Sequence, residues 1–347
     1  MMSVPSDPFE LADLMRRDLD AIDSAAIRRA LRIYGAARSR IIAQIDQLVA
    51  EVLAAVGDPD APFTSNALSL GTRAELLTQI ETVLTRAGVQ IEPTLIAARQ
   101  EAIGVALDYA EQMATAQGFS LKDRIDVSRS WTRLDERAVK ELVDRLDDGT
   151  PLNRWLRELG PDTKKAVEDV LERAVTEHAN VGDLSRELVK QTGMAERRAL
   201  MVTRESTFAV QRKATDQVYT ANSHLLSGKL RVERLDSKTC RFCLSEHGKT
   251  YPVNAVMPGH PGCRRTEIPV LRSGRGIQAV EQTGEEYLSS LSDEQQRMIL
   301  GGQSSLDAWK SGEVALADFT DVAETEWGPQ GRVRGLSFAK DKARKRS

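Results

Sequence analysis

All three cysteines of this 347-residue chain fall in one short stretch, at Cys240, Cys243 and Cys263. The first two form a C-x2-C pair, and sixteen residues later His260 and Cys263 form an H-x2-C pair. Tetrahedral zinc favours such pairs because a two-residue spacer aims both side chains at one point. An intervening segment of about 15–20 residues lets a hairpin bring two pairs together. The spacing therefore predicts a structural metal site with these four ligands.

Other uses of these side chains remain open at the level of sequence. A redox C-x2-C of the thioredoxin type needs a βαβ unit, and none is evident. A catalytic Cys–His pair could use His247 or His260, but no motif supplies an oxyanion hole or an orienting acid. Unliganded structural thiols beside a chance histidine are the third alternative. His247 is also a rival metal ligand to His260, although it lacks the paired spacing.

Composition narrows the class of protein. An odd number of cysteines, in a chain without an evident secretory signal, argues against a disulfide framework. The 41% hydrophobic and 29% charged residues predict a soluble protein with a sizeable core. A net charge of -3 argues against a protein that coats nucleic acid over its whole surface. No run approaches 18 apolar residues, so neither a membrane span nor a membrane partner is expected.

Long helices are expected to position this site. From Ser24 to Val56, apolar residues recur in steps of three and four, which favours a helix packed lengthwise in an intramolecular bundle, with an intermolecular coiled coil as the alternative. Thr72 and Glu75 form a candidate capping box, and Gly88 a candidate helix end. Thr150 and Pro151 are a candidate N-cap and first helical residue. Further helices are predicted at about 72–88, 92–117, 123–148, 162–179, 183–191 and 195–226.

After Gly228 the pattern changes to alternating polar and apolar residues, which predicts a strand over 229–236 and a second one over 266–271. Tyr251 and Val253 could form one arm of a hairpin. Beyond residue 276 the chain is expected to be helical again, with Ser292 and Gln295 as a capping box. The basic stretch 338–347 is expected to be disordered.

The predicted fold is mainly α: a long-helix N-terminal bundle, a small α+β zinc-knuckle-like module with a short β-hairpin, and a helical C-terminal tail. The expected domains are a helical region over 1–150, a module with the Cys/His residues over 151–275, and a C-terminal segment with a basic end over 276–347.

The stretch around the cysteines resembles the signature of phage head-morphogenesis proteins, the Mu F-like minor head proteins. That signature is similar to D-x-x-T-C-x-x-C, then G-K-x-(Y/F), then P-x-H-P-x-C-R-C and an apolar-Pro stretch. The matching residues are Asp236, Thr239, Cys240, Cys243, Gly248, Lys249, Tyr251, Pro258, His260, Pro261, Cys263, Arg264 and Pro269.

Weaker similarities flank this core, and together they cover roughly residues 160–325. Thr203, Arg204 and Glu205 stand where the family carries an R-T-E-like tripeptide on a helix, and the resemblance suggests that Glu205 accepts hydrogen bonds from backbone amides of the cysteine module. The chain departs from the family at Arg265, where a further cysteine is usual. Three cysteines and His260 still make a complete tetrahedral ligand set.

The resemblance implies a non-enzymatic virion component, a minor capsid or head-morphogenesis protein of a tailed phage or prophage. Such a protein would bind at or near the portal vertex and assist head assembly, and DNA packaging or ejection. The implied partners are the portal protein, a scaffold or major capsid protein, and phage DNA without sequence specificity. The implied cofactor is a structural zinc. The implied location is the capsid interior, with the host cytoplasm during assembly, and residues 1–150 are the candidate docking region.

A second function class is a zinc-stabilised nucleic-acid-binding module acting outside a virion. The basic residues near the C-terminal end could touch phosphates without base specificity, although an ordinary solvated tail is the slightly favoured alternative. An enzyme is a third class, for which no acid–base constellation is evident. The candidate phosphate contacts are Lys340, Lys342, Arg344, Lys345 and Arg346.

Overall fold

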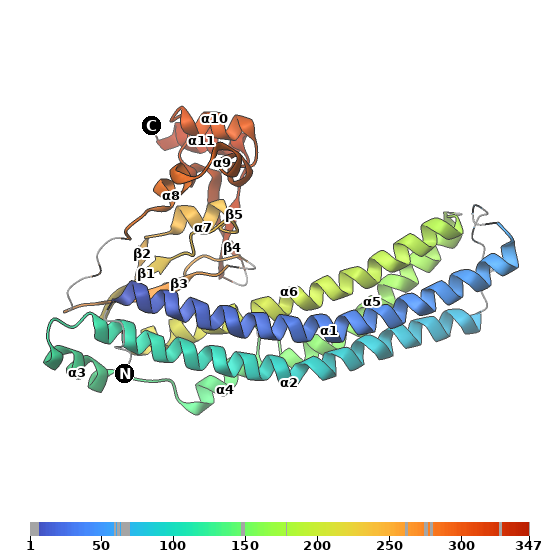
Figure 1. Cartoon of the computed structure of the whole chain (residues 1–347), viewed down its shortest axis with the longest axis horizontal. Helices are drawn as coiled ribbons and strands as arrows, with labels where there is room; N and C mark the ends of the chain where they lie inside the picture. Colours follow the sequence, from blue (N-terminus) through green and yellow to red (C-terminus); the bar gives the residue numbers. More distant parts are fainter. Residues whose placement is uncertain are drawn as a thin grey trace. The chain divides into compact units, whose positions relative to one another are not determined.

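The computed structural model describes residues 7–58, 60, 63, 70–146, 150–177, 179–260, 263–273, 277, 280–325 and 328–346. Its described part is mainly helical, with long helices in the N-terminal half, a small α+β part that contains the cysteines, and helices near the C-terminal end (Figure 1). The fold class predicted from the sequence is thereby confirmed.

The chain forms two compact units. The helical unit comprises Ala21–Glu101 and Glu141–Thr207, and the sheet unit comprises Met1–Asp20, Ala102–Lys140 and Phe208–Ser347. These units do not follow the three-part division at residues 150 and 275 that the sequence suggests, because three long helices supply residues to both. Those helices are α1 (Pro8–Val56), α2 (Leu70–Ala116) and α6 (Val181–Ala221).

Within the helical unit, α2 packs closely on α5 (Leu152–Thr176) through two glycines. A Cβ on Gly88 would lie 2.3 Å from the carbonyl oxygen of Leu156, and one on Gly160 would lie 2.5 Å from Thr85 Oγ1. Gly88 is therefore required by a close backbone approach, and the helix end predicted there is wrong. The predicted cap at Thr72 is also wrong, since α2 runs unbroken from Leu70 to Ala116.

Two other helix boundaries differ from the sequence-based ones. The single helix expected over 123–148 is two, α3 (Leu121–Ser130) and α4 (Glu136–Asp144). They separate because Trp131 leaves the helical conformation and packs its buried ring on Tyr219, with ring centroids 6.4 Å apart. The two helices expected over 183–191 and 195–226 are the one continuous helix α6.

The sheet unit contains a three-stranded antiparallel sheet in the order β2-β1-β3. Strand β3 (Thr266–Leu271) has the predicted bounds, whereas β1 (Leu226–Val232) begins three residues and ends four residues before the strand predicted over 229–236. Strand β2 is only Thr250–Tyr251. The sheet shares an apolar core with the adjoining ends of α2 and α6. That core includes Ala110, Ala114, Val218, Tyr219, Leu226, Val253 and Leu271.

The C-terminal part of the sheet unit adds a second core and a two-stranded sheet. Its elements are α7 (Arg241–Glu246), α8 (Gly284–Ser290), α9 (Asp293–Leu300), α10 (Gln303–Lys310), η2 (Leu316–Phe319), β4 (Thr320–Thr325), β5 (Gly328–Val333) and α11 (Leu336–Arg346). The predicted capping box of Ser292 and Gln295 is confirmed at α9, and Gly301 ends that helix in the left-handed region.

The expectation of a disordered basic end is wrong. Residues 336–346 form α11, whose Ala339 is fully buried in the same core as Phe319 and Leu316. Lys342 Nζ donates to the carbonyl oxygens of Ala317 and Thr320, at 2.8 and 2.6 Å. Packing and these bonds order a segment whose composition is typical of a solvated tail.

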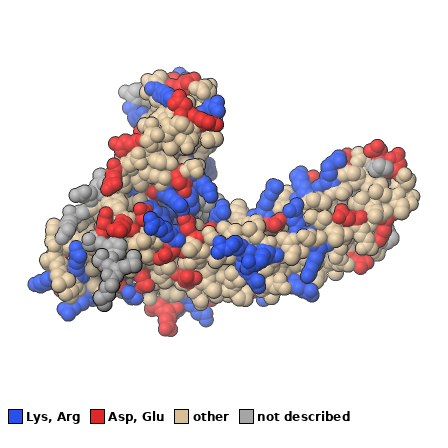
Figure 2. Space-filling model, viewed as in Figure 1, with Lys and Arg blue, Asp and Glu red and all other residues tan. Residues whose placement is uncertain are grey.

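Charges of both signs are interspersed on the face shown in Figure 2. Among the described helices, none combines the length and the apolar character needed to cross a bilayer.

Candidate metal centre

The four predicted ligands come from three local structures of the sheet unit. Cys240 is the N-cap of α7, and Cys243 lies in the first turn of that helix, with its backbone N–H 3.5 Å from Cys240 Sγ. Cys263 lies just before β3. His260 follows Gly259, which exchanges backbone hydrogen bonds with β5: its N–H donates to Pro329 and its carbonyl accepts from Gly331.

These segments bring the ligand atoms together. The Nε2 atom of His260 lies 3.2 Å from Cys240 Sγ and 3.0 Å from Cys243 Sγ. Cys243 Sγ lies 3.8 Å from Cys263 Sγ. Two thiolates that share a zinc ion at about 2.3 Å are about 3.8 Å apart in tetrahedral geometry. The sulfur pair therefore has the separation that a shared metal requires.

Glu233 is a neighbour of this cluster that the sequence analysis missed. The candidate ligand atoms form two overlapping groups, Cys240 with Cys243 and His260, and Glu233 with Cys243 and Cys263, and within each group they lie within 4.8 Å of one another. The sequence contained a signal for Glu233, because it follows Arg231 on the polar face of the strand predicted over 229–236. Its Oε1 is held by Arg231 Nε at 2.7 Å.

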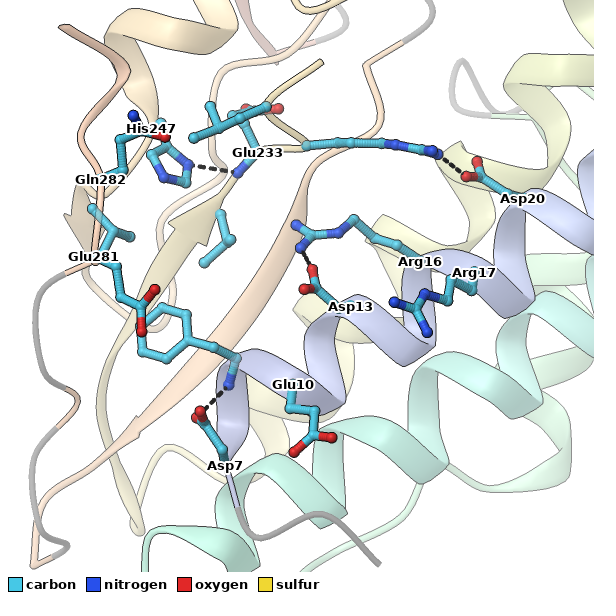
Figure 3. A pocket seen from close by; sticks show the side chains of 15 residues that line it. Asp7, Glu10, Asp13, Arg16, Arg17, Asp20, Glu233, His247, Glu281 and Gln282 are labelled. Carbon is cyan, nitrogen blue, oxygen red and sulfur yellow. Dashed lines mark hydrogen bonds and ion pairs between the residues drawn. The ribbon is translucent and has the colours of Figure 1, made fainter. Parts of the chain in front are cut away.

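The rival ligand His247 is turned away from the cluster. Its Nδ1 accepts a hydrogen bond of 2.9 Å from the backbone N–H of Glu233, and its ring also bonds to the backbone of Gln282. It lines a cavity of about 610 Å³ between the start of α1 and the end of β1 (Figure 3). Burial lowers the pKa of His247 to about 4, so the ring is neutral near pH 7. His260, and not His247, joins the thiols.

The pKa values of the three thiols are shifted in different directions, and two of the three thiols are shifted towards the thiolate form that binds metals. Hydrogen bonding from Cys243 and the nearby His260 lower the pKa of Cys240 to about 4, against the effect of burial. The pKa of Cys263 is also lowered, first by a hydrogen bond from Cys243 and then, against burial, by Arg265 and Arg231. The pKa of Cys243 is raised because its thiol is the shared donor to both neighbours. A divalent ion that displaced this proton would meet three thiolates and the imidazole of His260.

The polar face of the β1–β3 pair is a buried row of charges beside the thiols. Arg231 lies opposite Glu267 in the strand register. Arg265 Nε lies 3.2 Å from Glu267 Oε1, and Lys229 Nζ lies 3.6 Å from the other oxygen of that carboxylate. Lys229 also pairs with Asp216 of α6. Buried charges need such partners, since a lone one is strongly destabilising.

Arg265, at the position where the resembled signature has a further cysteine, carries a positive charge. It is 4% exposed, and its Nη1 lies 4.0 Å from Cys263 Sγ. Its Nη2 donates to the carbonyl of Met257 at 3.4 Å. The position thus contributes a cation beside a thiolate and no further ligand.

Other residues of the signature hold the loops around the cluster. Arg264 donates two hydrogen bonds, of 2.7 and 2.9 Å, to the carboxylate of Asp236. Burial opposes ionisation of Asp236, but the bonds from Arg264 prevail and lower its pKa. Thr239 donates to the same carboxylate at 3.1 Å. These three side chains join the segment before Cys240 to the segment after Cys263.

The G-K-x-Y piece forms the turn that leads into β2. Gly248 has φ +82°, a left-handed conformation that favours glycine. Lys249 Nζ lies 2.6 Å from the carboxylate of Glu246, which also accepts a hydrogen bond from Tyr251 Oη. Pro261, the remaining proline of the signature between His260 and Cys263, lies outside the described residues.

The described side chains of the helical tripeptide and of the basic end have other partners. Arg204 belongs to the helical unit, 3.9 Å from Asp23, and the side chain of Glu205 lies outside the described residues. At the basic end, Lys340 pairs with Glu313 at 2.9 Å and Arg346 with Asp318 at 3.0 Å. These two cations already have carboxylate partners within the chain.

The surroundings of the C-x2-C pair differ from those of a redox motif. The β1 strand pairs antiparallel with both neighbours, and the described strands contain no parallel βαβ unit of the kind that a thioredoxin-type site uses.

Comparison of the chain with protein-family models, with curated proteins and with solved structures finds no match.

Proposed function

We propose that Cys240, Cys243, Cys263 and His260 hold one structural zinc ion. The observation that carries the proposal is the approach of His260 Nε2 to the sulfurs of Cys240 and Cys243, at 3.2 and 3.0 Å, and of Cys263 Sγ to Cys243 Sγ, at 3.8 Å. Among the common divalent metals, zinc is the one that a set of three thiolates and an imidazole favours. Four protein ligands leave no position for substrate, which favours a structural over a catalytic ion.

The metal proposal is tested by elemental analysis of the purified chain and of Cys263→Ser. One zinc per wild-type chain is expected, and the variant should lose it. Because metal binding supplies folding free energy, the sheet unit of Cys263→Ser should unfold at lower urea concentration while the helical unit keeps its helical circular dichroism. A wild-type chain that carries no zinc, with Cys263→Ser equally stable, would refute the site.

We further propose that the chain is a non-enzymatic minor capsid or head-morphogenesis protein that binds a phage portal. The proposal is supported by the resemblance around the cysteines and by the contacts through which the matching residues stabilise the surrounding loops. Thr239 and Arg264 both donate to the carboxylate of Asp236, and Gly248 supplies a left-handed turn. A signature whose members stabilise one rigid module suits a component that docks rather than catalyses.

Co-expression with a portal protein tests this role. The chain should co-purify with portal rings and be incorporated into proheads, and Cys263→Ser should weaken both. The chain's failure to co-purify with any portal encoded beside it would refute the proposal.

The second candidate, nucleic-acid binding outside a virion, predicts salt-dependent affinity for DNA that falls when residues 339–347 are removed. Since Lys340 and Arg346 have carboxylate partners within the chain, the structure offers less support for it. Unchanged affinity after the truncation would exclude this segment as the DNA contact.

A further inference from the structure

A fully buried guanidinium lies against two of the proposed ligands. Arg231 is 0% exposed, and its Nη2 lies 3.9 Å from Cys243 Sγ and 3.8 Å from Cys263 Sγ. Those two sulfurs are 3.8 Å apart. A single amino group of Arg231 therefore faces both sulfurs at once.

Every other part of this guanidinium is also fixed. Its Nε bonds to Glu233 Oε1 at 2.7 Å, its Nη1 donates to the carbonyl of Pro258, and its Cζ lies 5.4 Å from the ring centroid of Phe242. The three nitrogens thus have three separate sets of partners, an arrangement that needs the planar fork of arginine. The single ammonium of a lysine cannot reproduce it.

The partners of Arg231 belong to each segment that carries a ligand. Cys243 and Phe242 lie on α7, Pro258 lies two residues before His260, and Cys263 leads into β3. Arg265 contacts one of these sulfurs and not both: its Nη1 lies 4.0 Å from Cys263 Sγ. Outer groups that orient metal ligands commonly change metal affinity by about 10–100-fold when they are mutated.

We propose that Arg231, and to a lesser degree Arg265, are positioning residues of the metal centre. Arg231 holds the sulfurs of Cys243 and Cys263 at metal-binding separation before the ion arrives, and it slows release of the ion afterwards. This inference rests on the proposed zinc site and assigns the order of importance of the two guanidiniums around it.

The test uses the full-length, zinc-loaded chain and its Arg231→Lys and Arg265→Lys variants. Transfer of zinc to an excess of a chromogenic chelator is followed with time. Arg231→Lys should release zinc at least about tenfold faster than wild type, and Arg265→Lys should show an intermediate rate. Cobalt-loaded Arg231→Lys should keep the thiolate-to-cobalt absorption band, which shows that the ligand set is unchanged and only its hold on the ion is weaker.

Arg241→Lys is the matched control. Arg241 of α7 also donates to backbone carbonyls, those of Leu300 and Arg334, and lies 5.4 Å from the centroid of an aromatic ring, that of Phe319. No sulfur contact of Arg241 is seen in the described residues. Its lysine variant should lose stability but release zinc at the wild-type rate. Equal release rates in Arg231→Lys and Arg241→Lys would overturn the proposal. If Arg231→Lys does not fold, zinc release from Arg265→Lys at the wild-type rate overturns it as well.

A metal-free measurement separates this inference from the zinc site itself. Phenylarsine oxide joins two neighbouring thiols with loss of water, and in a Cys240→Ser background only Cys243 and Cys263 are present. Adding Arg231→Lys should weaken its binding by at least about tenfold, whereas adding Arg241→Lys should not. A wild-type chain without zinc would refute the zinc site alone. Equal phenylarsine affinity with and without Arg231 would refute the positioning role.

Discussion

Gly331 of β5 lies directly against the ring of Phe242, the residue before Cys243. A Cβ added to Gly331 would lie 2.1, 2.2 and 2.4 Å from Cε1, Cζ and Cδ1 of that ring. Ordinary carbon–carbon contacts are about 3.5–4.0 Å, so Gly331→Ala forces the ring to move by roughly 1.5 Å. We expect this variant to destabilise the sheet unit and to weaken metal binding.

The ring has little room in which to move. Phe242 is 1% exposed, its ring centroid is 6.2 Å from that of His260, and the guanidinium of Arg231 lies over it. Overpacking of a core by a methyl group costs about 1–3 kcal/mol. Since three ring atoms are affected and α7 carries two ligands, we expect a loss near the upper end, about 3 kcal/mol.

Urea unfolding measures the loss, with Gly335→Ala as control. Nothing lies within 4 Å of a Cβ at Gly335, so that variant should change the free energy of unfolding by less than about 0.5 kcal/mol. Phe242→Leu removes the ring edge and should relieve the clash. The double variant should therefore be more stable than the sum of the two single losses predicts, by at least about 1 kcal/mol. Equal stability of Gly331→Ala and Gly335→Ala would refute the reasoning.

Four further variants test other parts of the fold. Gly104→Ala should stabilise the protein by about 0.5–1 kcal/mol in urea unfolding, because Gly104 is an exposed mid-helix residue with nothing within 4 Å of its Cβ position. Gly88→Ala in the same helix should instead destabilise the protein by more than 1 kcal/mol. A stabilising effect of Gly88→Ala would contradict the close approach of α5. Arg99→Met should destabilise the helical unit by about 3 kcal/mol, because the buried Arg99 donates to the carbonyls of Val143 and Ser206, at 2.8 and 3.2 Å, and methionine leaves them without this donor. A loss of stability below 1 kcal/mol would contradict the structural importance of these hydrogen bonds. His247→Asn should reduce the pH dependence of stability. Because the folded pKa of about 4 lies below the unfolded value of about 6.5, the contribution of His247 to wild-type stability is fully present above pH 6.5 and falls as the pH is lowered towards 4. Identical pH profiles of the two chains would count against a neutral, buried ring.

The proximity of the three cysteines and His260 could be predicted because it depends on local sequence. The paired spacing of Cys240, Cys243, His260 and Cys263 depends only on short turns. The choice of His260 over His247 followed from the same spacing, and the hydrogen bonds of His247 now give its physical reason. The capping box at Ser292 was equally local.

The missed features depend on residues far apart in the sequence. Gly88 looks like a helix end until Leu156, in another helix, is seen to pass close to it. The end of the chain looks like a solvated tail until Ala339 is seen to be buried against residues of α7 and η2. The β4–β5 hairpin was not predicted, since its place is determined by Phe242 and Gly259 and not by strong strand propensity of its own.

The pairing of Gly259 with β5 has a consequence for the order of events during synthesis. About 70 residues separate Cys263 from Gly331, so at about 5–20 residues per second all three thiols are made several seconds before the strand that secures their loop. A nascent chain arrested in that interval would expose the cysteines to solvent and to passing oxidants. Released chains truncated near residue 300 should therefore react faster with a thiol reagent than the full-length chain, which includes β5.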